Sequence, residues 1–186
     1  MKSGYIWVGW NPVLVDFNSC YVSSQAIHGT LKVLHTGLTL YLTTVYGEHT
    51  FVARISLWSD IFHLSSTLSD DPWLVAGDFN TIRDSSDRLG SPKTWLPSFD
   101  ESSECICQAK LDNLRYVGIR FTWSTSLGPH RKQRKIDRVL VNSKWSMVYS
   151  YLEATFLPPG ISDHSPMLVK VLASRPQKSP FKFFNF

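Results

Sequence analysis

Two short polar strings in this 186-residue chain combine side chains that can do acid–base chemistry. Gly77-Asp78-Phe79-Asn80 follows an apolar run, and Ser162-Asp163-His164 follows a Pro-Pro-Gly turn. Each string stands where a predicted strand meets a loop, which is the usual location of a site in an α/β sheet. A carboxylate and an amide from one strand end, with an Asp-His pair from another, suit hydrolysis of a phosphodiester. The two strings therefore define a candidate hydrolytic site.

The first string allows two interpretations. Because alternate residues at a strand end face the same side, Asp78 and Asn80 can both reach one phosphate. Asp78 can orient a water molecule or hold a metal, and Asn80 can position the nucleophile without adding charge. Gly-Asp and Phe-Asn are also turn-forming pairs, so an Asx turn that only closes the strand explains the same residues. The tetrapeptide alone leaves both interpretations open.

In the second string, His164 can act as a general acid or base, or can stabilise charge on a phosphate. An imidazole in that role needs a carboxylate or carbonyl to fix its tautomer, and Asp163 is adjacent. The alternative is an exposed loop histidine. A further carboxylate, Asp137, lies in an otherwise apolar predicted strand, where an unpaired charge is costly. We expect Asp137 to face outward or to bond a specific partner.

A cluster of basic residues surrounds Asp137 in the sequence. Its Lys and Arg residues are Arg131, Lys132, Arg134, Lys135 and Arg138, here called the basic loop. We expect them to contact the phosphate backbone of a nucleic acid at the rim of the site, with a solvated loop as the alternative. Trp123 either packs in the core, which is the interpretation we favour, or stacks on a base.

The elements predicted around these residues indicate an α/β protein. Strands are predicted over residues 5–8, 20–28, 31–35, 38–46, 73–76, 121–123, 136–141, 151–156 and 167–172, with turns at Gly29 and Gly37. Helices are predicted over residues 50–68 and 97–113, and a short one begins near Asn142 or Ser143. The apolar face of the first helix is expected to contain Phe51, Ile55, Trp58, Ile61, Phe62 and Leu64. The first strands are too close for helical crossovers, so we expect a layered sandwich of two mixed β-sheets flanked by helices.

Composition limits the class of protein further. The length fits one domain, expected over residues 1–173, with a loose tail over residues 174–186. A net charge of +4 favours an anionic partner, with nucleic acid ahead of a membrane. Three cysteines without metal-site spacing indicate reduced, buried thiols, and we expect an intracellular protein, nuclear or cytoplasmic, without a signal peptide or membrane span. Motifs of serine hydrolases, P-loop NTPases, dinucleotide enzymes and zincins are absent.

Five segments, taken in this order, resemble the endonuclease/exonuclease/phosphatase superfamily, and more closely the endonuclease domain of plant LINE-type non-LTR retrotransposons. These segments are Thr44–Gly47, Trp73–Asn80, Phe121–Trp123, Lys135–Asn142 and Ser162–Leu168. The resemblance covers nearly all of the chain. It implies a Mg²⁺-dependent phosphodiesterase that nicks DNA. A small-molecule phosphatase of the same superfamily fits the basic loop less well.

The resemblance also implies roles for single residues. Tyr46 would contact the phosphate region, and Asp78 and Asn80 would orient the attacking water. Asp163 would pair with His164, which would hold the scissile phosphate, and Asp163 is a possible metal ligand as well.

Two further residues would support the site, Asp137 from the neighbouring strand and Arg54 from the helix after residue 46. The departure from the family lies in the first 45 residues. Family members begin with a strand that carries an Asn, followed by a helix and a strand that ends in a metal-binding Glu. In residues 1–45 of this chain, the only acidic residue is Asp16. We therefore expect the first strand–helix–strand module and the principal Glu ligand to be absent, and catalysis to be impaired. The alternative is an inactive retroelement remnant that at most binds nucleic acid through the basic loop.

Overall fold

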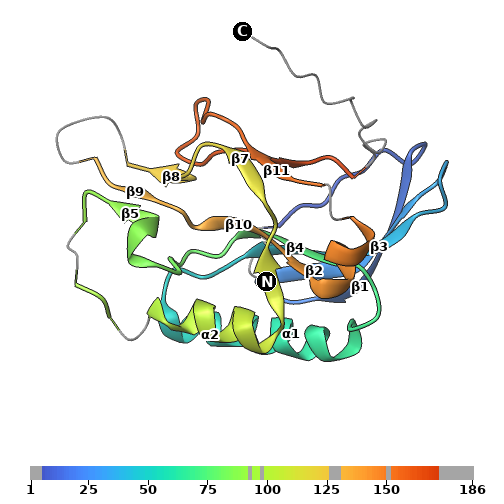
Figure 1. Cartoon of the computed structure of the whole chain (residues 1–186), viewed down its shortest axis with the longest axis horizontal. Helices are drawn as coiled ribbons and strands as arrows, with labels where there is room; N and C mark the ends of the chain where they lie inside the picture. The colour runs from blue at the N-terminus through green and yellow to red at the C-terminus, as the bar shows by residue number, and fades with distance from the viewer. Residues whose placement is uncertain (1–5, 92–93, 97–98, 126–130, 150–151, 172–186) are drawn as a thin grey trace, which may run out of the picture.

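The chain folds into three layers (Figure 1). The computed structural model describes residues 6–91, 94–96, 99–125, 131–149 and 152–171. A six-stranded sheet forms the middle layer, and helices α1 (Phe51–Thr67) and α2 (Glu101–Gln108) cover one of its faces. A three-stranded sheet and the short helix α3 (Ser143–Val148) pack on the other face. This arrangement confirms the expected α/β layered sandwich with mixed sheets.

The central sheet places the predicted site residues at one edge. Its strands, in spatial order, are β1 (Val15–Val22), β2 (Ala26–Val33), β3 (Thr39–Tyr46), β4 (Trp73–Asp78), β10 (Asp137–Asn142) and β6 (Leu111–Asn113). Strands β3 and β4 are parallel and joined by α1, whereas the other neighbours are antiparallel. Parallel strands end at the same edge, and there Asp78 pairs with Tyr46 on one side and with Asp137 on the other.

Two smaller sheets complete the fold. The sheet that packs on the central sheet opposite α1 and α2 contains β12 (Met167–Val169), β11 (Ala154–Phe156) and β7 (Tyr116–Gly118). A further sheet contains β5 (Arg88–Leu89), β9 (Gln133–Arg134) and β8 (Trp123–Ser124). Its strand β5 comes directly after the 3₁₀ turn η1 (Ser85–Asp87). A single bridge between Trp123 and His164 connects this sheet to the loop before β12.

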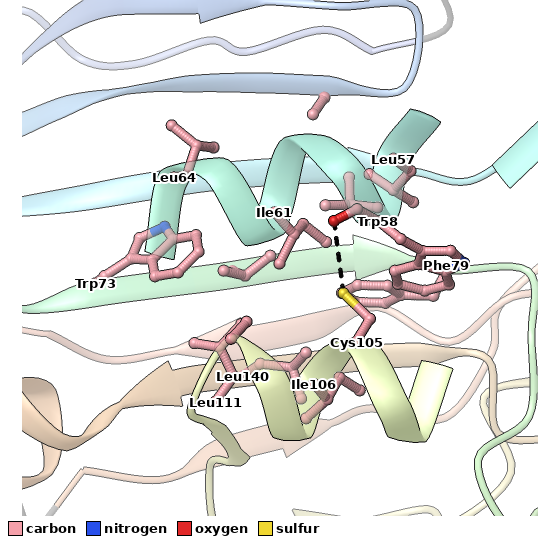
Figure 2. Packing of buried hydrophobic residues seen from close by; sticks show 14 of the residues in the cluster. Leu57, Trp58, Ile61, Leu64, Trp73, Phe79, Cys105, Ile106, Leu111 and Leu140 are labelled. Atoms are coloured by element: carbon pink, nitrogen blue, oxygen red, sulfur yellow. Dashed lines mark hydrogen bonds between the residues drawn. The ribbon is translucent and has the colours of Figure 1, made fainter. Parts of the chain in front are cut away.

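Two apolar clusters hold the layers together. Between the helices and the central sheet, Leu64 of α1, Ile106 of α2 and Trp73 of β4 belong to one buried cluster (Figure 2). Between the two sheets, Val139 of β10 packs with Phe156 of β11. Each such buried side chain contributes about 1.5–3 kcal/mol relative to an exposed one. Because both faces of β4 and β10 are covered, the ends of these strands are held in fixed positions.

The predicted helices are confirmed in type, and one differs in its bounds. Thr50 caps α1 by accepting a hydrogen bond from the Ala53 backbone (3.3 Å), and Asn142 caps α3 by accepting from Trp145 (2.9 Å). The second helix, predicted over residues 97–113, runs over Glu101–Gln108, and Leu111–Asn113 form strand β6 instead. Residue 97 lies outside the described residues.

The predicted apolar face of α1 is partly wrong. Phe51, Ile55 and Phe62 are exposed, whereas Leu57, Trp58, Ile61 and Leu64 are buried. The helix carries apolar residues on more than one side, so spacing alone could not identify the side that faces the sheet.

The first predicted strands need correction. Residues 6–8 have no regular structure, and the predicted strand 20–28 is divided into β1 and β2 by a turn in which Ser23 Oγ accepts from the Ala26 backbone (3.2 Å). Gly29 lies inside β2 and not at a turn. A side chain is excluded at this position, because a Cβ there would come within 2.3 Å of the Asn18 carbonyl oxygen. Gly37 does lie at a turn, with φ of 70°. The short strands β5, β6, β7 and β9 were not predicted. The strand predicted over residues 73–76 extends to Asp78, the one predicted over 136–141 is shifted by one residue, and the other predicted strands are shorter in the structure.

All three cysteines are free, but only one is buried as expected. Cys105 is buried, which raises the pKa of its thiol to about 12, whereas Cys20 and Cys107 are exposed. Among the described residues, no helix has the length and apolar character needed to cross a membrane. The predicted tail over residues 174–186 lies outside the described part of the chain.

Candidate active site

Three side chains from separate segments meet at the carboxyl ends of β3 and β4. Asp78 is the last residue of β4, Asp137 is the first residue of β10, and His164 lies in the loop before β12. One ligand atom of each lies within 4.8 Å of the others. The Nδ1 atom of His164 is 3.0 Å from Asp137 Oδ2, and its Nε2 atom is 3.9 Å from Asp78 Oδ2. We call these three residues the Asp–His cluster.

A buried threonine, Thr122, fixes the position of this cluster. Its carbonyl accepts a hydrogen bond from the Ser165 backbone (2.8 Å), next to His164, and its hydroxyl oxygen accepts one from the Asp137 backbone (3.0 Å). Thr122 therefore connects the loop before β12 to the beginning of β10. No role was predicted for Thr122, although it lies inside the Phe121–Trp123 segment.

The surroundings of Asp78 make its ionised form unfavourable. Burial of the carboxyl group and the nearby charge of Asp137 raise the pKa of Asp78 to about 6. The hydrogen bond from the Asn80 backbone and the charges of His164 and His49 oppose this increase in pKa. His49, an exposed residue after β3, was not predicted to belong to the site, and its residue type was the only signal.

The charge state of His164 is controlled by Asp137. The hydrogen bond between His164 Nδ1 and the Asp137 carboxylate raises the pKa of His164, burial opposes the increase, and Asp137, Asp78 and Asp163 add to it through their charges. Because an ionised carboxylate can only accept, Nδ1–H is the donor in this bond. The specific partner expected for the buried Asp137 is therefore His164.

The predicted pairing of Asp163 with His164 is wrong. The hydrogen-bond partner of His164 Nδ1 is Asp137 (3.0 Å), whereas the Asp163 carboxylate bonds a different residue. The Oδ2 atom of Asp163 accepts a hydrogen bond from Trp123 Nε1 (3.0 Å). The interpretation of Trp123 as a core residue is also wrong, because its indole is half-buried and Arg134 lies 5.6 Å from the ring centroid. The role of Asp163 as a metal ligand remains a prediction.

The loop that follows β4 is fixed by hydrogen bonds to both neighbouring segments. The Asn80 backbone donates to Asp78 Oδ1 (2.8 Å), so the Asx turn is present and it also orients the Asp78 carboxylate. The Asn80 side chain donates to the Gly47 carbonyl (2.7 Å), and Arg54 Nη1 donates to the Asn80 carbonyl (3.1 Å). Arg54 is itself held in place by a buried ion pair with Glu101, so it connects α2 to the loop after β4.

The structure divides the basic loop into buried and accessible residues. Arg138 is buried in an ion pair with Asp87, and the buried Lys135 Nζ lies 3.1 Å from the centroid of the Tyr116 ring. Burial and nearby positive charge lower the pKa of Lys135 to about 8. The prediction that these two residues contact phosphate is wrong, because both side chains stabilise the fold.

Of the three remaining basic-loop residues, Arg131 lines a cavity beside the Asp–His cluster. Lys132 and Arg134 are exposed, and Arg131 is half-buried with Nη2 3.3 Å from Ser124 Oγ. The cavity has a volume of about 290 Å³, and its lining includes Arg131, Trp123 and Asp163. Aromatic, cationic and polar groups are thus available next to the cluster.

The donor set of the cluster suits a hard divalent cation. Asp78 and Asp137 bring carboxylate oxygens together, and Mg²⁺ prefers such oxygens, usually from one or two carboxylates. A cation there would relieve the repulsion that contributes to the raised pKa of Asp78. Imidazole is a poor ligand for Mg²⁺, and His164 is already bonded to Asp137, so the carboxylates are the candidate ligands.

Comparisons with known proteins agree with this architecture. The model of the endonuclease/exonuclease/phosphatase family matches residues 16–164. The endonuclease domain of TRAS1, a telomere-specific non-LTR retrotransposon, is similar with a TM-score of 0.66 and 15% identity, over 87% of this chain and 70% of that domain. TDP2 of D. rerio, solved with a single-strand DNA product, has a TM-score of 0.54 and 15% identity, over 84% and 68%. Beta toxin from Staphylococcus aureus has a TM-score of 0.56 and 12% identity, over 78% and 56%.

No curated protein matches the sequence. The chain spans just over half of the beta toxin structure, and at these identities the likeness to solved structures shows the fold alone. The family model, by contrast, covers most of the chain and includes all three residues of the Asp–His cluster. The chain therefore belongs to the endonuclease/exonuclease/phosphatase family.

Proposed function

We propose that this protein is a divalent-metal-dependent phosphodiesterase that nicks DNA. The observation that carries the proposal is the Asp–His cluster, in which two buried carboxylates, one at the end of β4 and one at the start of β10, face one imidazole. Family membership supports a phosphate-ester substrate, and the DNA-processing proteins among the similar structures support a nucleic acid. The net charge of +4 also favours a polyanion.

Asp78 is the proposed general base. With a pKa of about 6 it is mostly ionised at neutral pH and still basic enough to accept a proton. The attacking water loses its proton to Asp78, its oxygen forms a bond to phosphorus, and the bond from phosphorus to the leaving oxygen breaks. The Asn80 backbone holds the carboxylate in orientation (2.8 Å), and the predicted role of Asn80 in positioning the water fits its place in the same loop.

His164 is the proposed electrostatic stabiliser of the scissile phosphate. Asp137 fixes the ring through Nδ1, so Nε2 is directed toward Asp78 and the space where a phosphate would lie. The raised pKa of His164 favours the imidazolium form, whose charge offsets the negative charge that develops on the phosphate oxygens. Tyr46, at the end of β3, is proposed to contact the same phosphate.

Asp137 is the cluster residue proposed to hold a Mg²⁺ ion, with Asp163 as a further possible ligand, so that Asp78 keeps the basicity that its role as general base requires. Bound Mg²⁺ would act as a Lewis acid on a phosphate oxygen. The family's Glu ligand has no counterpart in residues 1–45, where the only acidic residue, Asp16, is exposed on β1. We therefore expect weak Mg²⁺ binding, and an inactive DNA-binding remnant is the second candidate.

A plasmid-nicking assay tests the proposal. Purified protein with Mg²⁺ is expected to convert supercoiled plasmid to nicked circles, and His164→Ala should reduce the rate by about 10²-fold or more. His35→Ala, which changes an exposed histidine in the turn after β2, is the matched control and should leave the rate unchanged. Nicking that persists in His164→Ala would contradict the catalytic assignment. DNA binding without nicking by the wild-type protein would favour the inactive remnant.

A further inference from the structure

A second cavity, of about 600 Å³, lies between the central sheet and helix α1. Residues of β1, β2, β3 and α1 line it, among them Tyr21, His28, Tyr41, Asp60 and His63. Tyr41 stands five residues before the end of β3, so the cavity is roughly 17 Å from the Asp–His cluster along the strand. Its volume falls within the range of small-molecule sites, roughly 300–1,000 Å³. The proposed hydrolysis uses none of these residues.

A buried histidine presents a hydrogen-bond donor to this cavity. His28 is only 3% exposed, and its Nδ1 atom lies 2.8 Å from Thr43 Oγ1, which also accepts from Trp73 Nε1 (2.8 Å). The Thr43 hydroxyl hydrogen has no other acceptor among the described residues, so it donates to His28 Nδ1. Burial lowers the pKa of His28 and keeps the ring neutral. The ring proton is therefore on Nε2, for which the described part of the chain offers no partner.

The other lining groups add an aromatic ring and an acceptor. The rings of His28 and Tyr41 are nearly parallel, with centroids 5.7 Å apart and an interplanar angle of 5°. On the opposite side, Asp60 Oδ1 accepts a hydrogen bond from the Tyr21 hydroxyl (2.8 Å), which leaves Oδ2 as a charged acceptor. No Lys or Arg among the described residues lines the cavity. This chemistry disfavours phosphates and favours a flat, neutral ring that both donates and accepts hydrogen bonds.

We propose that this cavity binds an aminopurine base as a free small molecule. The exocyclic amino group would donate to Asp60, a ring nitrogen would accept from His28 Nε2 at the edge of the imidazole, and the face of the bicyclic ring would lie against Tyr41. The proposal does not depend on hydrolytic activity, so a protein that fails to nick DNA can still confirm it.

Isothermal titration calorimetry with adenine tests this site. We expect a dissociation constant on the order of 10⁻⁴ M for the wild-type protein. Asp60→Asn should weaken adenine binding by about tenfold, because the charged acceptor is lost. The matched control is Asp71→Asn, which removes an exposed carboxylate outside the cavity lining and should have no effect.

A second ligand separates a specific contact from general apolar binding. Unsubstituted purine lacks the amino group, so it should bind the wild-type protein about tenfold more weakly than adenine and should be insensitive to Asp60→Asn. Asp60 is half-buried on a helix surface, so its substitution should leave the protein folded. Absence of adenine binding at millimolar concentration, or equal binding by wild type and Asp60→Asn, would overturn the proposal.

Discussion

Two pairs of buried carboxylates in this protein have opposite surroundings. In the first pair, each carboxylate has its own buried arginine. Glu101 pairs with Arg54 and also accepts a hydrogen bond from Trp58 Nε1 (2.8 Å), and Asp87 pairs with Arg138. An arginine side chain stays protonated at any relevant pH, so these carboxylates are neutralised permanently.

In the second pair, Asp78 and Asp137 lie opposite each other on β4 and β10 and share a single histidine. Unlike an arginine, a histidine can lose its proton, and Asp137 raises the pKa of His164 above its usual value, so the charge of this group depends on pH. The unfavourable environment appears directly in the pKa of Asp78, which is raised to about 6.

The difference separates the scaffold from the site. Arginine-paired carboxylates stabilise the segments behind the site, whereas the histidine-sharing pair retains an unfavourable interaction in the folded protein. Perturbed pKa values of this kind are concentrated where acid–base chemistry occurs. The comparison therefore predicts that substitutions in the two pairs will have different effects on folding and on cleavage.

The largest effect on stability is expected from Arg138→Met. The substitution leaves Asp87 buried without its cation, which should lower the free energy of unfolding by about 3–5 kcal/mol in urea denaturation. Arg115→Met is the matched control, because Arg115 forms an exposed pair with Glu153 (3.4 Å) whose loss should cost at most about 1 kcal/mol. Equal losses in the two variants would show that the buried pair has no special structural role.

Comparison of Asp137→Asn with Asp163→Asn tests which of the two carboxylates is the partner of His164. In Asp137→Asn, the asparagine can still accept from Nδ1, but the loss of charge should lower the pKa of His164 and reduce cleavage by about 10²-fold. Asp163→Asn should change both quantities less, because Asp163 contributes least to the raised pKa of His164. Titration of the His164 ring protons by NMR measures the pKa, and a larger change in Asp163→Asn would reverse the assignment.

The smallest effect concerns the accessible part of the basic loop. The double substitution Lys132→Ala with Arg134→Ala should reduce the slope of log binding constant against log salt by about 2 for duplex DNA. Lys32→Ala, at an exposed position on β2, serves as the control and should leave the slope unchanged. An unchanged slope in the double variant would remove the basic loop from the DNA interface.

Local signals predicted the parts of the molecule that depend on neighbouring residues. The predicted start of α1 at residue 50 agrees with the structure to within one residue, and of the two predicted caps of α3, Asn142 and Ser143, Asn142 is the cap. The apolar run before Asp78 correctly indicated a buried strand that ends at the site. These features follow from hydrogen bonds and burial within a few residues, so the sequence was sufficient to predict them.

Partners that are distant in sequence could not be predicted in this way. The bond between Asp137 and His164 joins residues 27 positions apart and depends on the position of the loop before β12. Arg138 lies in a basic run that resembles a solvated loop, but its partner Asp87 is 51 residues away. Both contacts depend on the packing of β10 against its neighbours, which periodicity and composition do not specify.

The free energy of unfolding and the cleavage rate of Asp78→Asn, measured together, test the central claim most directly. Because the folded-state pKa of Asp78 is raised, the stabilisation from its proton is complete below about pH 4 and is lost as pH rises through about 6. At pH 8 the substitution should therefore stabilise the protein by about 2 kcal/mol while abolishing cleavage. A variant that is less stable than wild type at pH 8, or that cleaves DNA at the wild-type rate, would contradict the assignment of the Asp–His cluster as a catalytic site.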